Sequence, residues 1–459
     1  MDGILALSAV AQARLIRERR IGAVELVQAH LRQIADVNPR IHAVTEVLAE
    51  RAVAEARAAD LARPRGPLHG VPFSIKDSIE LAGTVSTAGT IGRRGAAPST
   101  ADATLVARLR NAGAIPIAKT NLPDLLFAFE SDNLLFGRTN NPYDVARTPG
   151  GSSGGEAALI AACGSPMGLG SDCAGSVRLP AAFCGIAAIK PTTGRLARTG
   201  HFPPSGGWIE ALWQIGPMAR RVEDLCLMLG LLVGADCMDP SVVDMPFAPL
   251  ADVGLDGLRI AFYTDNGFAA PDAEVASVVR AAGEALGAQE RLPPCVTSAY
   301  ELEMKLLGAD GGESVRAYLA GLGSTVLHPL LNGWLDKLTA YRTDLAGFES
   351  YWAEWDRYRA AMAAFLRQYD AIVCPVYTQP ALPHGTSLED ANFRGFSYTM
   401  AFNVAGLPAA VIRCGETAAG LPIAVQVVAR PWREDIALAI AARLEREFGG
   451  WKAPAEEGT

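Results

Sequence analysis

Two glycine-rich loops that carry serines constrain the fold of this chain more than any other feature. The first reads Gly-Gly-Ser-Ser-Gly-Gly from 150 to 155, and the second reads Ala-Gly-Ser-Val-Arg from 174 to 178. Glycines let a backbone turn tightly, approach a ligand closely and leave amide N–H groups open. A run of small and aliphatic residues, 157–162, and an apolar segment, 166–170, separate the loops. We expect a buried helix–strand unit that points the serines of both loops at one place.

The composition is that of a large, mildly acidic protein. The chain has 459 residues, of which 50% are hydrophobic, and a net charge of -8. This length allows a large core, and the acidity argues against nucleic acid as a partner. The eight cysteines have neither metal-ligand spacing nor a paired framework, so we expect reduced thiols, a cytoplasmic location and no metal or cofactor. No apolar run reaches membrane-spanning length. A homodimer is left open.

Helices and apolar strands alternate along the chain, which favours α/β layers around a sheet. The clearest patterns predict helices at 8–36 (with Ser8 as N-cap), 46–61, 222–232 and 434–448, and strands at 371–375 and 422–429. Residues 402–408 are interpreted as a turn, and residues 295–345 have only weak patterning. No linker divides the chain, so we expect one domain over residues 1–459.

A lysine stands at the end of an apolar segment that reads as a buried strand. Residues 68–75 are largely apolar and lead directly to Lys76. On one interpretation the lysine only extends its charged end to water at the end of the strand. On the other it is desolvated, which disfavours its charged form and makes it a usable base. With Ser152 as relay and Ser176 as nucleophile, the second interpretation gives a catalytic constellation.

Other interpretations of the loops stay open on the residues alone. A glycine loop before a helix can hold phosphate, but no Lys-Ser/Thr pair follows Gly155 and no acidic Mg²⁺ ligand is evident. Residues 151–155 also satisfy the nucleophile-elbow pattern, with Ser153 as nucleophile. That pattern requires a downstream histidine, and the candidates are His201, His328 and His384. Both loops could instead be structural in a binding protein.

The motifs taken together resemble the amidase signature family. The residues that carry the resemblance are those of the loop at 150–155, the segments 175–185 and 190–192, and the shorter matches at 72–77, 216–220, 402–408 and 421–426. The combination is much more specific than any single motif. It covers most of the chain, with a core at about 65–235 and a less well matched region at about 240–400.

The resemblance implies a single α/β domain with a mixed central sheet flanked by helices. It also implies a Ser–cis-Ser–Lys triad, with Ser176 as nucleophile, Ser152 as relay and Lys76 as base. The cis peptide bond would join Gly151 to Ser152. An amide carbonyl is a poor electrophile, so the serine must be activated and the oxyanion held. Neutral Lys76 would take a proton from Ser152 while Ser152 takes one from Ser176.

The loop before the nucleophile departs from the usual pattern of this family. The oxyanion hole is expected from four backbone amides, those of Cys173, Ala174, Gly175 and Ser176. Ala174 stands where the family usually has glycine, so a positive φ at this position would strain the loop. Asp172 and Arg178 flank the loop, and we interpret them as an ion pair that holds it.

The substrate is less well specified than the chemistry. Residues 121–142 are similar to the corresponding part of fatty acid amide hydrolases, and that match places Leu126 and Ala128 on the acyl side. The aromatic residues available for an apolar pocket are Trp208, Trp213, Phe247, Tyr300, Trp334 and Tyr351. We therefore expect a small amide or carbamate substrate: an aryl or alkyl amide, an anilide or a urethane, with accompanying esterase activity. The alternative is an amidase-like subunit of an amidotransferase, or a catalytically silent binding or assembly protein.

Overall fold

One mixed β-sheet of eleven strands organises the fold in the computed structural model, which describes residues 2–204, 206–248 and 253–455. In spatial order the strands are β1 (Val44–Val47), β3 (Ile115–Thr120), β2 (Pro72–Lys76), β6 (Met167–Asp172), β8 (Gln214–Ala219), β7 (Ala187–Lys190), β12 (Ala409–Glu416), β13 (Pro422–Ala429), β11 (Ala371–Pro375), β9 (Ile260–Phe262) and β10 (Gln289–Glu290). β2 pairs in parallel with both β3 and β6, whereas β8 pairs antiparallel with both β6 and β7. A separate hairpin joins β4 (Asp132–Asn133) to β5 (Gly137–Arg138).

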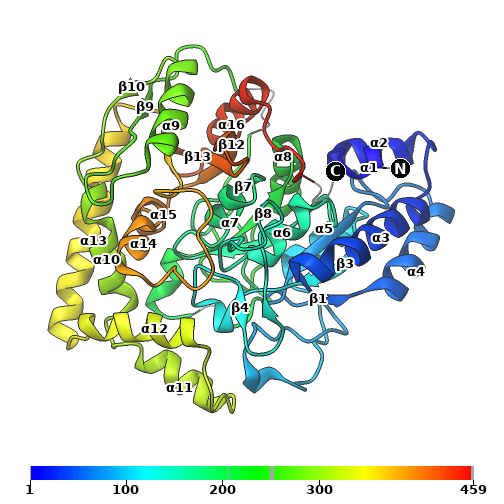
Figure 1. The fold of residues 1–459 in the computed structure, drawn as a ribbon, viewed down its shortest axis with the longest axis horizontal. Helices are drawn as coiled ribbons and strands as arrows, with labels where there is room; N and C mark the ends of the chain where they lie inside the picture. The colour runs from blue at the N-terminus through cyan, green and yellow to red at the C-terminus, as the bar shows by residue number, and fades with distance from the viewer. Residues whose placement is uncertain (1, 205, 249–252, 456–459) are drawn as a thin grey trace.

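Helices flank this sheet, and a second helical group lies at one side of the molecule (Figure 1). The helices nearer the N-terminus are α1 (Asp2–Leu5), α2 (Ala9–Arg17), α3 (Ala23–Ile41), α4 (Ala49–Leu61), α5 (Thr104–Asn111), α6 (Gly154–Ala161), α7 (Arg178–Phe183) and α8 (Val222–Leu232). The later helices are α9 (Ala273–Ala285), α10 (Ala299–Leu307), α11 (Glu313–Gly321), α12 (Pro329–Leu338), α13 (Leu345–Leu366), α14 (Asp390–Gly395), α15 (Ser397–Val404) and α16 (Glu434–Phe448). In Figure 1 the yellow helices α11 to α13 stand far from the blue helices α2 to α4.

Two hydrophobic cores meet at the second serine loop. The larger core joins the sheet to α3, α6, α8, α9 and α16. The smaller core joins α10, α12, α13 and α15 to the segment that contains Leu125 and Phe129. Cys173, which directly follows β6, packs against both cores. The loop that carries Ser176 is therefore held between the sheet and the second helical group.

Several elements predicted from the sequence pattern are confirmed. The expected strands at 371–375 and 422–429 coincide with β11 and β13, and the expected helices at 222–232 and 434–448 coincide with α8 and α16. Ser8 is the N-cap of α2, where its hydroxyl accepts a hydrogen bond from the Ala11 amide. The helix expected at 46–61 begins later, at Ala49, because the preceding residues form the edge strand β1. The weakly patterned residues 295–345 include α10, α11 and α12.

One predicted element is wrong, and another is confirmed only in part. The single helix expected at 8–36 is two helices, because the chain turns through Arg19 at φ 56° before α3 begins at Ala23. A carboxylate from α4, that of Asp60, accepts the Ala23 amide at 2.6 Å and so stabilises the new helix start. The turn expected at 402–408 is confirmed in part, because residues 402–404 complete α15 and residues 405–406 form the turn that follows it. Within the described part of the chain, none of the helices has the length and apolar character of a membrane span.

Candidate active site

Lys76 and Ser152 are in direct contact at the first serine loop. Lys76 is the last residue of β2, and Ser152 lies in the loop that precedes α6. The Lys76 Nζ lies 2.7 Å from the Ser152 Oγ, and both side chains are buried. The peptide bond between Gly151 and Ser152 is cis, as the family resemblance implied. The strand end and the glycine loop therefore bring an amine and a hydroxyl into direct contact.

Close packing explains the glycine that precedes Ser152. A β-carbon on Gly151 would lie 2.6 Å from the Ala128 carbonyl oxygen and 2.6 Å from the Glu130 amide nitrogen. Both are backbone atoms, so no side-chain movement could relieve the overlap. The segment around Ala128 thus lies directly against the loop that presents Ser152, and only glycine fits between them.

Burial of Lys76 changes its proton affinity. Removal from water disfavours the ammonium ion and lowers the pKa of Lys76 to about 7, although the charges of Asp172 and Glu156 oppose the shift. Burial also raises the pKa of Glu156 to about 7, against the effect of hydrogen bonds from Ser74 and Thr120. A substantial fraction of Lys76 is therefore neutral near neutral pH, as a general base requires.

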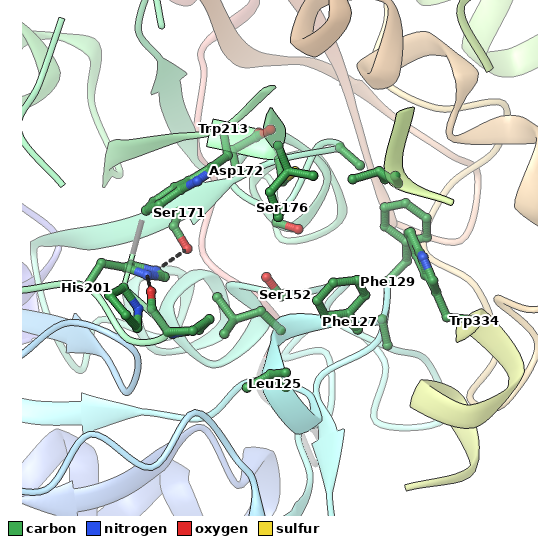
Figure 2. A pocket seen from close by; sticks show the side chains of 18 of the residues that line it. Leu125, Phe127, Phe129, Ser152, Ser171, Asp172, Ser176, His201, Trp213 and Trp334 are labelled. Atoms are coloured by element: carbon green, nitrogen blue, oxygen red, sulfur yellow. Dashed lines mark hydrogen bonds between the residues drawn. The ribbon is translucent and has the colours of Figure 1, made fainter. Parts of the chain in front are cut away.

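Ser176 occupies the open side of the same site. It is 7% exposed, compared with 0% for Lys76 and 1% for Ser152, and both serines line one pocket. Figure 2 shows the two hydroxyls facing the same part of this pocket. Ser176 is also tied to the first loop, because its carbonyl oxygen accepts the Ser153 amide at 3.0 Å. Within the described residues the Ser176 hydroxyl makes no hydrogen bond to Ser152, so a relay through Ser152 requires this contact to form during the reaction.

An ion pair holds the loop between β6 and α7, as the sequence indicated. Arg178 Nε lies 2.9 Å from Asp172 Oδ2, and neither side chain is exposed. Asp172 also accepts the backbone amides of Gly175 at 2.8 Å and Val177 at 3.1 Å. The Arg178 guanidinium, helped by a hydrogen bond from Asn403, holds the pKa of Asp172 below its usual range despite burial. The nucleophile loop is therefore fixed from within by one carboxylate.

Replacing Asp172 by alanine should lower the free energy of unfolding by about 3–5 kcal/mol, because it leaves the Arg178 charge buried without a partner. Since the pKa of Asp172 is depressed in the fold, its contribution is present above the unfolded pKa and is lost as the pH falls through the folded value. Urea denaturation at neutral pH measures the change. Asp356→Ala is the control, because its pair with Arg359 is exposed and should contribute less than about 1 kcal/mol. Equal losses in the two variants would contradict this account.

The alanine that departs from the family pattern is not strained. Ala174 is absent from the residues with positive φ, whereas Gly175 has φ 122°, and a β-carbon there would lie 2.4 Å from Thr399 Oγ1. The glycine requirement thus falls on residue 175. Because the Gly175 amide already donates to Asp172, the expected oxyanion donors reduce to the amides of Cys173, Ala174 and Ser176.

Of the three candidate histidines, the structure brings one to the site. His201 lines the pocket, whereas His328 Nε2 lies 3.6 Å from Asp132 and His384 Nε2 contacts the Val145 carbonyl at 3.2 Å. None of the three histidines makes a hydrogen bond to Ser153, which the nucleophile-elbow interpretation needed. His201 follows Gly200 in a loop of glycines and prolines. Such a loop has no periodic pattern from which the position of its side chains relative to the sheet could be predicted.

The pocket itself is mostly apolar. Leu126 and Ala128 are among its lining residues, and their assignment to the acyl side stays a prediction. Of the six aromatic candidates, Trp213 and Trp334 line the pocket, while Phe247, Tyr300 and Tyr351 pack at the two cores. The Trp208 side chain lies outside the described part of the structure. Phe127 and Phe129 also line the pocket; they belong to the hydrophobic segment 121–133, for which surface packing and a pocket wall were the two interpretations. The lining residues that the sequence did not indicate include Leu125, Ile209 and Leu307.

No group of three or more His, Cys, Asp or Glu side chains in residues 2–204, 206–248 and 253–455 is arranged to hold a metal ion. The ionisable side chains that line the pocket are those of Asp172, Cys173 and His201. Burial raises the pKa of the Cys173 thiol well above its ordinary value, so the thiol is a poor nucleophile. The thiol is therefore a weak competitor of the serine hydroxyls as nucleophile.

Comparison with known proteins gives consistent matches over nearly the whole chain. The family model described as Amidase matches residues 25–438. Human fatty-acid amide hydrolase 2 is 33% identical and aligns over 99% of this chain and 91% of its own length. A glutamyl-tRNA(Gln) amidotransferase subunit from Roseiflexus sp. is 36% identical over 93% of each chain. A 6-aminohexanoate cyclic dimer hydrolase superposes with a TM-score of 0.88 and 28% identity, covering 98% of this chain and 99% of its own.

Proposed function

The chain belongs to the amidase family and is a hydrolase of amide C–N bonds, and on this premise we propose that it cleaves small uncharged amides and carbamates through an acyl-enzyme on Ser176. The single observation that carries the proposal is the buried contact of 2.7 Å between the Lys76 amine and the Ser152 hydroxyl, beside a pocket that Ser176 also lines.

The reaction begins with two linked proton transfers. Neutral Lys76 accepts the hydroxyl proton of Ser152, and Ser152 accepts the hydroxyl proton of Ser176 as the Ser176 oxygen forms a bond to the acyl carbon. The carbonyl oxygen takes the electron pair, and the backbone amides of Cys173, Ala174 and Ser176 stabilise the resulting oxyanion. The charge that appears on Lys76 is stabilised by Asp172 and Glu156, which favour its cationic form.

The leaving group then departs by the reverse transfer. Lys76 returns its proton to Ser152, and Ser152 gives its own to the leaving nitrogen, so the C–N bond breaks to release a neutral amine. Water next attacks the acyl carbon, and its proton passes to Ser152 as Ser152 gives its own to Lys76. The same relay then returns a proton to the Ser176 oxygen as its bond to the acyl carbon breaks, which releases the acid and restores neutral Lys76. An ester or a carbamate would be attacked by the same serine with the same proton relay. An alkoxide is a better leaving group than an amine, so its departure depends less on protonation by Ser152.

The pocket favours uncharged substrates. Lysine and arginine are absent from its described lining, and the one carboxylate there, Asp172, is neutralised by Arg178. Its volume is about 130 Å³, similar to the apolar cavity of roughly 150 Å³ that holds benzene in a well-studied case. An aryl group or a short alkyl chain therefore fits, and the partly open mouth leaves room for the remainder of the substrate. Two relatives act on amides of aliphatic acids, judging by their names.

A substrate panel tests this proposal. We expect kcat/KM for a neutral anilide or an aryl carbamate to exceed that for glutamine by at least about 100-fold, because the pocket offers no partner for the charged ends of glutamine. Steady-state kinetics on anilides, alkyl amides, carbamates, esters and glutamine measure the order. A preference for glutamine would instead support a role as part of an amidotransferase, which the Roseiflexus relative keeps in view.

A further inference from the structure

His201 is connected to Lys76 through one hydroxyl. The Ser171 Oγ lies 3.1 Å from Lys76 Nζ and 3.1 Å from His201 Nε2 (Figure 2 marks the second contact). The other ring nitrogen of His201, Nδ1, lies 3.1 Å from the Pro203 carbonyl oxygen. The ring is buried and packs against Trp213 with centroids 4.6 Å apart. The imidazole thus stands one residue away from the base without touching it.

The partners of His201 determine which of its nitrogens carries the proton. The Pro203 carbonyl can only accept, so Nδ1 must be the donor. Burial lowers the pKa of His201 to about 3, and the neighbouring charges of Lys76, Arg198 and Lys119 act in the same direction. The ring is therefore neutral, and Nε2 is an acceptor. It can take the hydroxyl proton of Ser171 or that of Ser78, which also lies 3.1 Å away.

The hydrogen-bond donors and acceptors of Lys76 can be assigned in the same way. Neutral Lys76 has two N–H donors and one lone pair, and its three oxygen contacts are the Ser171 hydroxyl at 3.1 Å, the Ser171 carbonyl at 3.3 Å and the Ser152 hydroxyl at 2.7 Å. The Ser171 carbonyl can only accept. If the Ser171 hydroxyl proton points to His201, this hydroxyl also accepts from Lys76. Both amine protons are then used, and the lone pair is left for Ser152.

We propose that His201 is a positioning residue that withdraws the Ser171 hydroxyl proton from Lys76, so that the lone pair of the amine faces Ser152. The inference rests on the proposed role of Lys76 as base. Without an acceptor at Nε2, the Ser171 hydroxyl is free to donate to Lys76, which occupies the lone pair in an unproductive contact. Asp172 and Glu156 remain the charged groups that act on Lys76 in either arrangement.

His201→Leu tests this role, with His201→Gln as the conservative variant whose carboxamide oxygen can replace Nε2 as acceptor. We expect His201→Leu to lower kcat about 10- to 100-fold with little change in KM, since the apolar pocket is kept. The acid limb of its kcat/KM profile should move to lower pH. In this variant the Ser171 hydroxyl donates a hydrogen bond to neutral Lys76, which stabilises the neutral form and lowers the pKa of the amine. His201→Gln should recover most of the lost kcat.

A double-mutant cycle with Ser171→Ala separates positioning from general damage. If His201 acts through the Ser171 hydroxyl, His201→Leu should cost nothing further once that hydroxyl is gone. Ser78→Ala is the matched control, because Ser78 also contacts Nε2 but does not contact Lys76; its kcat and acid limb should equal those of the wild type.

Three results would overturn the positioning role: an unchanged kcat in His201→Leu, an equal loss in the Ser171→Ala background, or no recovery in His201→Gln. Failure of the proposed function would give a different result. In that case Lys76→Met and Ser176→Ala would stay active, both with histidine and with leucine at position 201.

Discussion

Ser176→Ala is expected to abolish both amide hydrolysis and covalent labelling by a fluorophosphonate. Removal of a nucleophile that acts together with its base costs roughly 10⁴- to 10⁶-fold in kcat, so activity should fall to the background of the assay. The fold should be preserved, because the Ser176 hydroxyl is at the open pocket and has no hydrogen bond to lose within the described part of the structure. Intact-protein mass spectrometry after probe treatment gives the labelling result directly.

Ser153→Ala is the matched control for this experiment. Ser153 is adjacent to Ser152 and was the nucleophile of the alternative hydrolase interpretation, but its hydroxyl contacts the backbone of Ser171 at 3.3 Å. Labelling should persist in this variant. Labelling that survives Ser176→Ala and disappears in Ser153→Ala would transfer the nucleophile to residue 153. Absence of labelling in the wild type would favour the silent binding or assembly protein.

Lys76→Met is expected to lower kcat by at least about 10³-fold, because the same amine takes and returns the proton in both halves of the reaction. In the wild type, kcat/KM should rise as the pH passes upward through about 7, where Lys76 loses its proton. The methionine variant should lose this acid limb along with the activity. Rates measured between pH 5 and 10 provide the comparison.

The same substitution should stabilise the fold at neutral pH, because a buried lysine with a depressed pKa destabilises the folded state there. The pKa of Lys76 lies far below its value in an unfolded chain, so between about pH 7 and 10 the unfolded state binds more protons. Stability therefore rises with pH across this window in the wild type, and methionine removes the underlying cost of burial. Lys190→Met is the matched comparison for burial, since this buried lysine also has a pKa of about 7 and its replacement should change stability in the same direction. Its amine contacts the Pro191 carbonyl and not a serine of the site. A lower Tm for Lys76→Met would contradict this account.

Local pattern was sufficient for the parts of the fold and site that are buried in regular elements. The apolar run to Lys76 could be recognised as a strand because it lies in the sheet interior, and α16 keeps a helical apolar face over its whole length. The serine loops could be recognised because glycine is required there by close packing, as the contacts around Gly151 show. The triad contact between Lys76 and Ser152 was thus foreseeable in outline.

Tertiary contacts decided what the sequence could not indicate. The break before α3 depends on the carboxylate of Asp60, a residue of another helix. Leu307 reaches the pocket from the weakly patterned region, where helix faces pack on each other and no simple periodicity survives. His201 acquires its role only when its loop folds over β6 and meets Ser171.

The most direct test is an NMR titration of the Lys76 amine in protein labelled at lysine with ¹³C and ¹⁵N. Lys76→Met, Lys119→Met and Lys190→Met assign the three fully buried amines. The account predicts that Lys76 titrates near pH 7 and that its pKa coincides with the acid limb of kcat/KM. An amine at residue 76 that stays protonated above pH 9 while the enzyme is fully active at pH 8 would contradict it.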